Sequence, residues 1–320
     1  MASSGSYDFT VTRSNIIESA LRKCGVLIEG ASASSAQLTN GAEALNIILK
    51  ALASTGLPLW NIFRGYIYPM EDVNKATFGT DHISTELIHT QVSTAASASD
   101  TTIEVDSITS MAASDNIGIE CSDGTIHWDT ISGSPSGTTV TLTTGLDAAV
   151  AVDANVYVYT TKMTSPLRIT HAWRRLYSAG DGQLGGKTTP INIVSREEFF
   201  AISDLTTEDY PYTMYHQPKL TSGSLLGEVH FYNRYKDGKA LIEFDCWQRF
   251  EDMDSATDNL GMPQEWFSAI VWELAAVLAV EYGCPGAKVA YCEQKAGVER
   301  VKVEQMGMEE GSVYFVPRME

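Results

Sequence analysis

The sequence predicts an α+β protein: a four-helix bundle made of two helical hairpins from the two ends of the chain, with a large β-rich insertion that includes a small five-stranded β-barrel or sandwich. Apolar residues recur at helical spacing only near the two ends, whereas the middle alternates apolar and polar residues. The 320 residues suggest about two domains and can bury a sizeable core.

The first hairpin is predicted from two apolar stripes near the N-terminus. One stripe follows Thr12, a suitable N-cap, and stops before Gly25. The second runs from Leu38 to Leu52 in steps of four and three. Because the connector 26–36 is short, we expect the two helices to lie antiparallel with their stripes facing each other.

The second hairpin is predicted near the C-terminus. Pro263 suits the first position of a helix whose broad apolar face spans 266–282. A fourth helix should start at Pro285, although Gly297 in its interior costs about 1 kcal/mol relative to Ala. Residues 305–320 show no helical stripe and are expected to form an extended tail.

The middle of the chain is predicted to be β-rich. Five short strands between 100 and 160 should form the small barrel or sandwich, entered through the low-complexity linker 92–99. Four more strands, at 61–68, 167–177, 228–235 and 240–247, and a short helix capped by Ser195 flank it. The predicted domains are a helical core (1–60 with 262–305), a β-rich domain (61–92 with 161–261), an inserted β domain (93–160) and a tail (306–320).

The charge balance argues against nucleic-acid recognition. The chain has 40 acidic and 22 basic side chains, a net charge of −18. Only 19% of its residues are charged, so the imbalance reflects scarce Lys and Arg rather than acidic blocks. Affinity for duplex DNA comes from cations that neutralise phosphates, so we expect no specific DNA binding.

The cysteines and the hydropathy pattern indicate in which compartment the protein is expected. Five cysteines form an odd set without a C-x-x-C pair, which favours buried free thiols over disulfides or zinc ligation. Residues 1–7 lack the features of a secretory signal. The most apolar stretch, 269–280, contains Glu273 and is shorter than the about 20 residues of a membrane span. We expect no signal and no membrane association.

Three patterns resemble catalytic or binding motifs but lack the required context. The run 180–185 matches G-x-G-x-x-G, yet the residues after it predict a strand instead of a helix. The acidic cluster 251–258 has Ala256 and Thr257 where an EF-hand loop needs an oxygen ligand and a glycine. The six histidines show no ligand spacing and no local partner. We therefore expect a protein that is not an enzyme, with no catalytic residue, no cofactor and no metal.

One basic and aromatic cluster stands out in the predicted strand 167–177. Simple alternation places Arg168 on one face of this strand and Trp173 and Arg175 on the other. We interpret these three residues as a subunit contact to an acidic neighbour rather than as a nucleic-acid site.

The N-terminal helices resemble a known family. The segments Ile16–Gly25 (I-I-E-S-A-L-R-K-C-G), Leu45–Leu52 (L-N-I-I-L-K-A-L) and Gly56–Trp60 (G-L-P-L-W) resemble the first helical hairpin of head-to-tail adaptors of short-tailed bacteriophages. These proteins are also called tail accessory factors or tail tubular protein A.

Other segments extend this resemblance. Trp266–Gly283 and the following helix with Lys288, Tyr291 and Lys295 resemble the second hairpin of the family, followed by its C-terminal tail. The middle segments Ser165–Thr170, Ser195–Phe199 and Tyr210–Tyr215 resemble stretches of longer adaptors, and the 100–160 module resembles small β domains inserted in virion proteins. Compact adaptors lack so large an insertion.

The resemblance implies a structural virion protein. It implies a homo-oligomeric, dodecameric ring beneath the portal protein that extends the DNA channel and carries a tail nozzle or tail fibre protein. Its place would be the neck of the virion, after assembly in the host cytoplasm. Double-stranded DNA would pass without specific binding, helped by the like charge of an acidic lumen. The tail 306–320 would reach the portal, with Tyr314, Phe315 and Val316 as apolar anchors.

Two alternatives belong to other classes. A tail fibre or decoration protein would use the β module for carbohydrate or capsid contact. A tail-associated cell-wall hydrolase would need convergent acids in a pocket and turnover in isolation.

Overall fold

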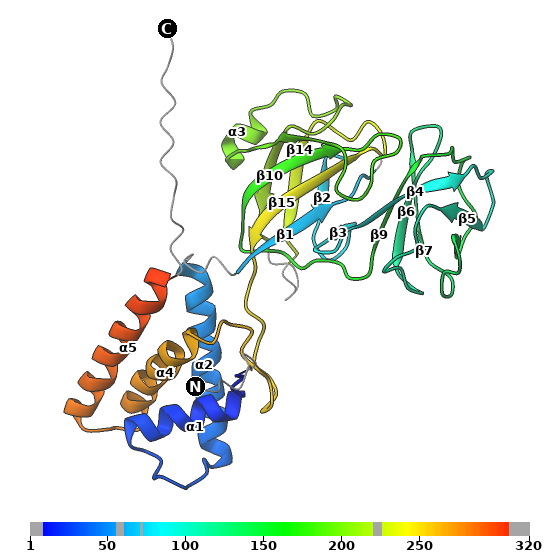
Figure 1. Cartoon of the computed structure of the whole chain (residues 1–320). Coiled ribbons are helices and arrows are strands. Elements are labelled where there is room, and N and C mark those ends of the chain that lie inside the picture. The colour runs from blue at the N-terminus through cyan, green and yellow to red at the C-terminus, as the bar shows by residue number, and fades with distance from the viewer. Residues whose placement is uncertain (1–8, 56–60, 71–72, 220–225, 307–320) are drawn as a thin grey trace, which may run out of the picture. The chain divides into compact units, whose positions relative to one another are not determined.

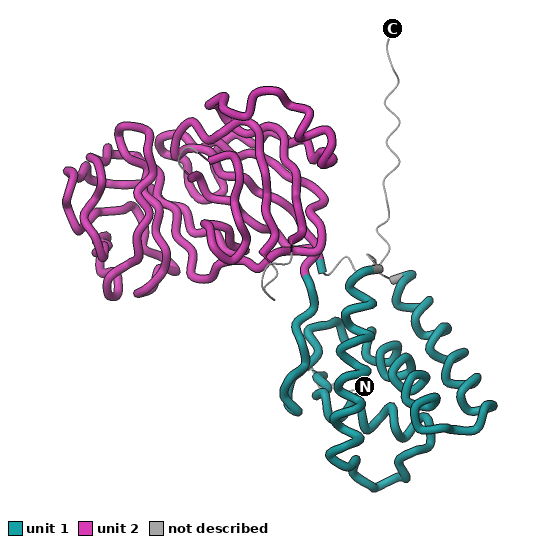
Figure 2. The backbone as a smooth tube through the Cα atoms, turned by 180° about the vertical axis from the view of Figure 1, so that it is seen from behind, with its two compact units in different colours: residues 1–61, 249–320 teal, residues 62–248 magenta. Residues whose placement is uncertain are grey.

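The structure is a computed structural model that describes residues 9–55, 61–70, 73–219 and 226–306 (Figure 1). The chain divides into two compact units, a helical unit of residues 1–61 with 249–320 and a β unit of residues 62–248 (Figure 2). None of the helices in the described ranges combines the length and apolar character that crossing a membrane requires.

The helical unit contains four of the helices expected from the apolar stripes. They are α1 (Arg13–Cys24), α2 (Ser35–Thr55), α4 (Trp266–Glu281) and α5 (Gly286–Met306). Thr12 caps α1 by accepting a hydrogen bond from the Asn15 amide, and Gly25 ends it in the left-handed region at φ 86°. The helix α5 continues through Gly297, so packing outweighs the cost of that glycine.

The predicted fold class is wrong. The described residues form a mixed α/β protein with five helices, three sheets, one of them a half-barrel, and more strand than helix, without a four-helix bundle from the two chain ends. In the helical unit, α1 crosses α2 instead of lying antiparallel to it (Figure 1). The buried stripe of α1 packs mainly on α4, which is apolar on nearly all sides and contacts α1, α2 and α5. Because α4 is apolar on nearly all sides, α1, α2 and α5 can each bury an apolar stripe against it. The helices therefore do not have to pair as two separate hairpins.

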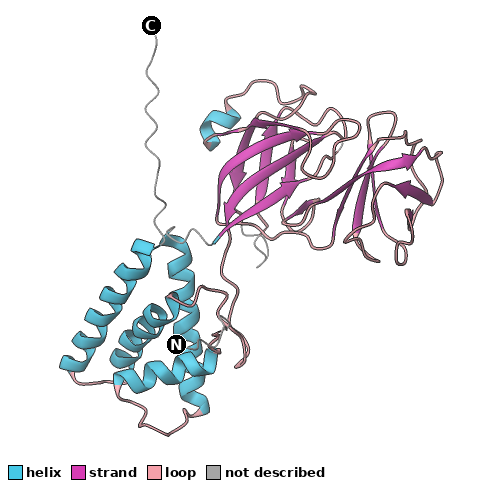
Figure 3. Ribbon diagram, viewed as in Figure 1, coloured by secondary structure: helices cyan, strands magenta, loops and turns pink. Residues whose placement is uncertain are grey.

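One part of the β unit consists of two sheets that pack face to face (Figure 3). A five-stranded sheet has the order β11-β10-β15-β1-β3, with β1 Ile62–Ile67, β3 Ile83–Ser84, β10 Arg168–Leu176, β11 Lys187–Pro190 and β15 Ala240–Trp247. A four-stranded sheet has the order β12-β13-β14-β2, with β2 Lys75–Thr77, β12 Asn192–Ile193, β13 Thr213–Gln217 and β14 Glu228–Tyr232. Their inner faces enclose one core, with Phe244 from one sheet and Phe231 from the other fully buried. The predicted short helix is α3 (Arg196–Phe200), and Ser195 caps it as expected.

The inserted module has six strands instead of five. Its sheet has the order β7-β6-β9-β4-β5-β8, with β4 Ile88–Thr94, β5 Thr102–Val105, β6 Asn116–Glu120, β7 Ile126–Thr130, β8 Thr139–Thr141 and β9 Asn155–Tyr159. The extra strand is β4, whose second half falls in the segment expected to be a linker. Val92 is fully buried there, because it faces the apolar core of the module. A domain boundary at 93 therefore falls inside a strand.

An aromatic seam joins the inserted module to the five-stranded sheet. We use this term for the buried side chains of Tyr68, Tyr157, Tyr159 and Tyr177 with the adjoining Trp128. The Trp128 indole donates a hydrogen bond of 3.1 Å to the Pro69 carbonyl, and the Tyr157 hydroxyl donates one of 2.8 Å to the Gly238 carbonyl. Large aromatic burial with satisfied polar ends makes the junction a packed interface within this unit.

Gly118→Val is expected to weaken this seam. Gly118 lies opposite Trp128 in the β6–β7 ladder, and a Cβ atom there would come within 2.6 Å of the indole ring. We expect the free energy of unfolding to fall by about 2 kcal/mol, because the ring must leave its place. Urea unfolding followed by tryptophan fluorescence measures this change. Gly182→Val, at a position with open space around it, is the control, and equal midpoints for the two variants would contradict the prediction.

Candidate functional site

The predicted site residues fall into two groups. Tyr314, Phe315 and Val316 lie outside the described residues. Arg168, Trp173 and Arg175 lie on β10 of the five-stranded sheet.

The prediction that alternation separates Arg168 from Trp173 and Arg175 is wrong. The ladder between β10 and β15 shifts register between Ile169 and His171, where a bulge adds one residue to β10. As a result, Arg168 pairs with Trp247, Trp173 with Glu243 and Arg175 with Leu241, which are positions on one face of β15. All three predicted residues therefore share the outer face of the sheet.

Most of the positive charge on this outer face is already paired. Arg175 donates a hydrogen bond to the buried carboxylate of Glu243. Arg64 donates a 3.0 Å hydrogen bond to Asp245 and lies 5.3 Å from the ring centre of Trp173. These carboxylate hydrogen bonds raise the pKa of both guanidinium groups above their ordinary value. The outer face thus offers aromatic rings and internal ion pairs, with Arg168 exposed at one end.

The G-x-G-x-x-G run is a loop between strands, as predicted. Residues 180–185 connect β10 to β11, and Lys187–Pro190 is a strand instead of the helix that a dinucleotide site requires. The loop folds back on β10, because Arg175 donates hydrogen bonds to the carbonyl oxygens of Leu184 and Gly185.

The acidic cluster 251–258 is a surface segment of the helical unit. The Ser255 amide donates a 2.6 Å hydrogen bond to Asp258, and Lys50 lies 2.8 Å from the Asp252 carboxylate. Across the described ranges, no group of three or more His, Cys, Asp or Glu side chains is arranged to hold a metal ion.

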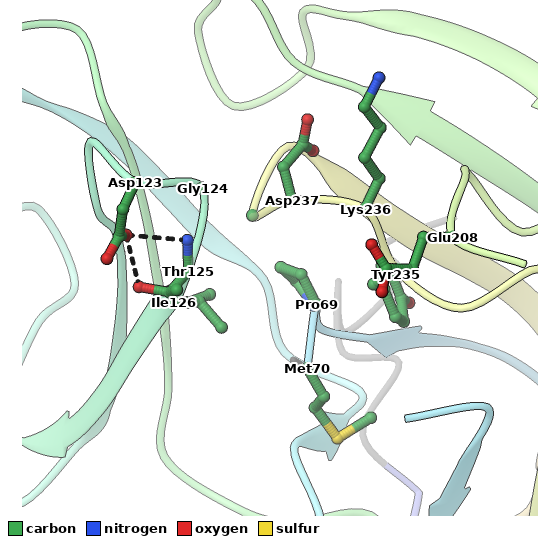
Figure 4. Close-up of a pocket in the computed structure, with 11 residues that line it drawn as sticks. Pro69, Met70, Asp123, Gly124, Thr125, Ile126, Glu208, Tyr235, Lys236 and Asp237 are labelled. Atoms are coloured by element: carbon green, nitrogen blue, oxygen red, sulfur yellow. Dashed lines mark hydrogen bonds between the residues drawn. The ribbon is translucent and has the colours of Figure 1, made fainter. Parts of the chain in front are cut away.

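An open pocket lies inside the β unit, between the inserted module and the two packed sheets. Its volume is about 320 Å³, and Figure 4 shows Asp123 on one wall with Asp237 and Glu208 across from it. Thr125 donates two hydrogen bonds to Asp123, which lowers the pKa of that carboxyl group. Burial raises the pKa of the Tyr210 hydroxyl, which donates to Asp237, to about 12. The described lining residues include carboxylates, the Thr125 hydroxyl and Lys236, but neither His nor Cys.

Two histidines lie beside the aromatic seam, His89 buried and His82 half-buried. His82 stacks on Trp128, and His89 stacks on Tyr177, each with 3.7 Å between ring centres. The His89 Nε2 lies 3.0 Å from the Asn155 side-chain oxygen. Burial lowers the pKa of both imidazoles to about 4. Both imidazoles are therefore uncharged at neutral pH and contribute by packing. The sequence alone did not reveal this role, because the partners of each histidine are distant in the chain.

The helical unit carries an apolar groove, which we call the helical groove. Two adjoining hollows of about 370 and 360 Å³ share Ile48 and Val277 and are lined by α2, α4 and α5. Beside these hollows, the side chains of Ile47 and Val280 are 63% and 62% exposed, whereas apolar residues of a protein core are almost fully buried. The charged residues at its edges are mostly acidic: Glu43, Glu273, Glu281 and Glu293, with Arg300 as the cation.

The opposite side of α5 carries a complementary stripe. Tyr291 and Val298 are 45% and 46% exposed and lie seven residues apart, on one face of the helix. Lys288 and Lys295 lie beside the Tyr291 ring, at 5.7 and 6.0 Å from its centre. Because residues 293, 296 and 300 of the same helix line the groove, α5 presents an acidic apolar groove on one side and a basic apolar stripe on the other.

Comparison with known proteins adds no assignment: neither the protein-family models nor the curated proteins give a match to this chain.

Proposed function

We propose that this protein is a structural virion component, a head-to-tail adaptor whose copies form a ring that joins the portal protein to the tail and extends the DNA channel. The observation that carries the proposal is the pair of complementary faces on α5. A groove on one side and a stripe on the other side of one helix form a head-to-tail contact, and such contacts close into rings when the rotation between copies allows it.

The charges support this arrangement. The acidic edge of the helical groove faces a basic stripe in the next copy, so each contact pairs Lys with Glu around an apolar centre. The net charge of −18 leaves the remaining surface acidic, which suits a channel through which DNA passes without adhering. The outer face of the β10 sheet, with Arg168, Trp173 and Arg175, is proposed as a further subunit contact.

The proposal also assigns partners and a location. The tail from Met306 onward, with Tyr314, Phe315 and Val316, is proposed to anchor the adaptor on the portal. The β unit is proposed to face a tail nozzle or tail fibre protein in the neck of the virion. The role is structural, without enzymatic turnover.

Native mass spectrometry of the purified protein, alone and mixed with portal rings of its phage, tests the proposal. We expect a monomer alone, stoichiometric loading on the portal, and loss of loading in a chain cut after Gln305. Failure of the full chain to bind the portal would overturn the adaptor function. A trimer that binds capsids without a portal would instead favour a fibre or decoration protein.

A further inference from the structure

Three cysteines from distant parts of the sequence lie close together in the helical unit. Cys24 ends α1, Cys284 lies in the turn between α4 and α5, and Cys292 lies on α5. The Cys284 sulfur lies 3.5 Å from the carbonyl oxygen of Cys24. A carbonyl oxygen is about 2.4 Å from its own Cα, which places the Cys284 sulfur within about 6 Å of the Cys24 Cα.

This contact brings the Cys284 sulfur close to the backbone of Cys24, and closeness of the two cysteines is the first condition for a disulfide. The Cys24 sulfur now donates a 3.2 Å hydrogen bond to the Leu21 carbonyl, and a rotation about the Cα–Cβ bond redirects it. The backbone around both residues is well fixed, since the Cys284 amide donates to the Ala279 carbonyl and Gly25 caps α1.

Access differs among the three thiols. Cys24 and Cys292 are 2% and 0% exposed, whereas Cys284 is half-buried. Burial raises the pKa of the Cys24 and Cys292 thiols, and the neighbouring Cys284 adds to both increases. An external reagent therefore meets Cys284 first, because the thiolate must be accessible to react.

We propose that Cys284 is a redox-reactive site that forms a disulfide with Cys24 and links the end of α1 to the turn between α4 and α5. The co-reactant is a low-molecular-weight disulfide of the glutathione type. The Cys284 thiolate attacks one of its sulfur atoms, the S–S bond breaks, and one small thiol leaves with the proton from Cys284. Cys24 then attacks the Cys284 sulfur and releases the second small thiol, which takes the proton from Cys24. Two protein thiols are oxidised and one small disulfide is reduced.

This disulfide would close a very long loop between the two ends of the chain. Cross-links of this kind stabilise a fold mainly by restricting the unfolded chain, and the effect grows with loop length. The proposal does not depend on the adaptor function, since it rests on the contacts of the helical unit alone.

The experiment treats the folded full-length protein with oxidised glutathione, counts free thiols and maps linked peptides by mass spectrometry without reduction. We expect the free thiols to fall from five to three, a Cys24–Cys284 peptide link, and full reversal by dithiothreitol. We also expect the melting temperature to rise by about 5 °C.

Two variants test which cysteines form the link. Cys292→Ser should form the same link, whereas Cys284→Ser should keep all its remaining thiols free. Five free thiols after treatment of the unsubstituted protein, a link from Cys284 to Cys292, a lasting glutathione adduct on Cys284, or covalent dimers would each overturn the proposal. The mapping on the unsubstituted protein gives an answer even where a variant does not fold.

Discussion

Val277→Asp is expected to abolish loading of the protein on portal rings. Val277 lies where the two hollows of the helical groove meet and is 45% exposed, so the substitution should leave the fold intact. In the proposed ring, the new carboxylate would be buried against the neighbouring copy, in the groove that Glu273 and Glu281 line. The apolar centre of the contact offers the new carboxylate no hydrogen-bond partner, and burying such a charge costs several kcal/mol, so we expect association to be weaker by about 100-fold or more.

Native mass spectrometry after mixing with portal rings measures this loss. Val152→Asp is the matched control, because Val152 is 51% exposed and lies in the β unit. The control should load normally and both variants should show the circular dichroism of the unsubstituted protein. Normal loading of Val277→Asp would exclude the helical groove as the subunit contact.

Acidification from pH 6.5 to 4 is expected to destabilise the β unit. His89 and His82 have a pKa of about 4 in the folded protein, against an ordinary value of 6.5. Between these values the unfolded chain binds more protons than the folded one, so the free energy of unfolding falls as the pH falls. His89 alone accounts for about 3 kcal/mol across this window, and His82, which is less buried, adds a smaller amount.

Urea unfolding at several pH values, followed by the fluorescence of Trp128 and the other tryptophans, measures the slope. His89→Gln should reduce the slope clearly, because Gln does not titrate. His171→Gln is the control for the loss of a histidine, since His171 is exposed on the outer face of the β10 sheet and lies away from the aromatic seam. An unchanged slope in His89→Gln would show that another group titrates in this window.

Local patterns in the sequence were sufficient for most elements. The i, i+3, i+4 stripes located all four long helices, and the alternation of apolar and polar residues located the five expected strands of the inserted module. The strand β4 was missed because its residues face two different interiors. Val92 packs into the module core, whereas His89 stacks on Tyr177 of the seam, so polar and apolar residues are buried alike.

The candidate sites depended more on tertiary structure. Residue types alone indicated Arg168, Trp173 and Arg175, but one inserted residue in β10 placed all three on one face of the sheet instead of on two. The helical groove could not be predicted from the sequence, because α2 near the N-terminus and α4 and α5 near the C-terminus line it together. Each of those helices shows an ordinary apolar stripe by itself.

The sequence by itself determined where the long helices and many of the strands form, the acidic character of the chain, and the absence of motif context for nucleotide or calcium binding. These properties depend on neighbours within a few residues or on composition. Only the tertiary structure decided that α1 crosses α2 to reach α4, that Cys24 approaches Cys284, and that two histidines stack on aromatic rings. Such contacts join residues up to 260 positions apart, and they follow from which apolar surfaces cover one another rather than from any local periodicity.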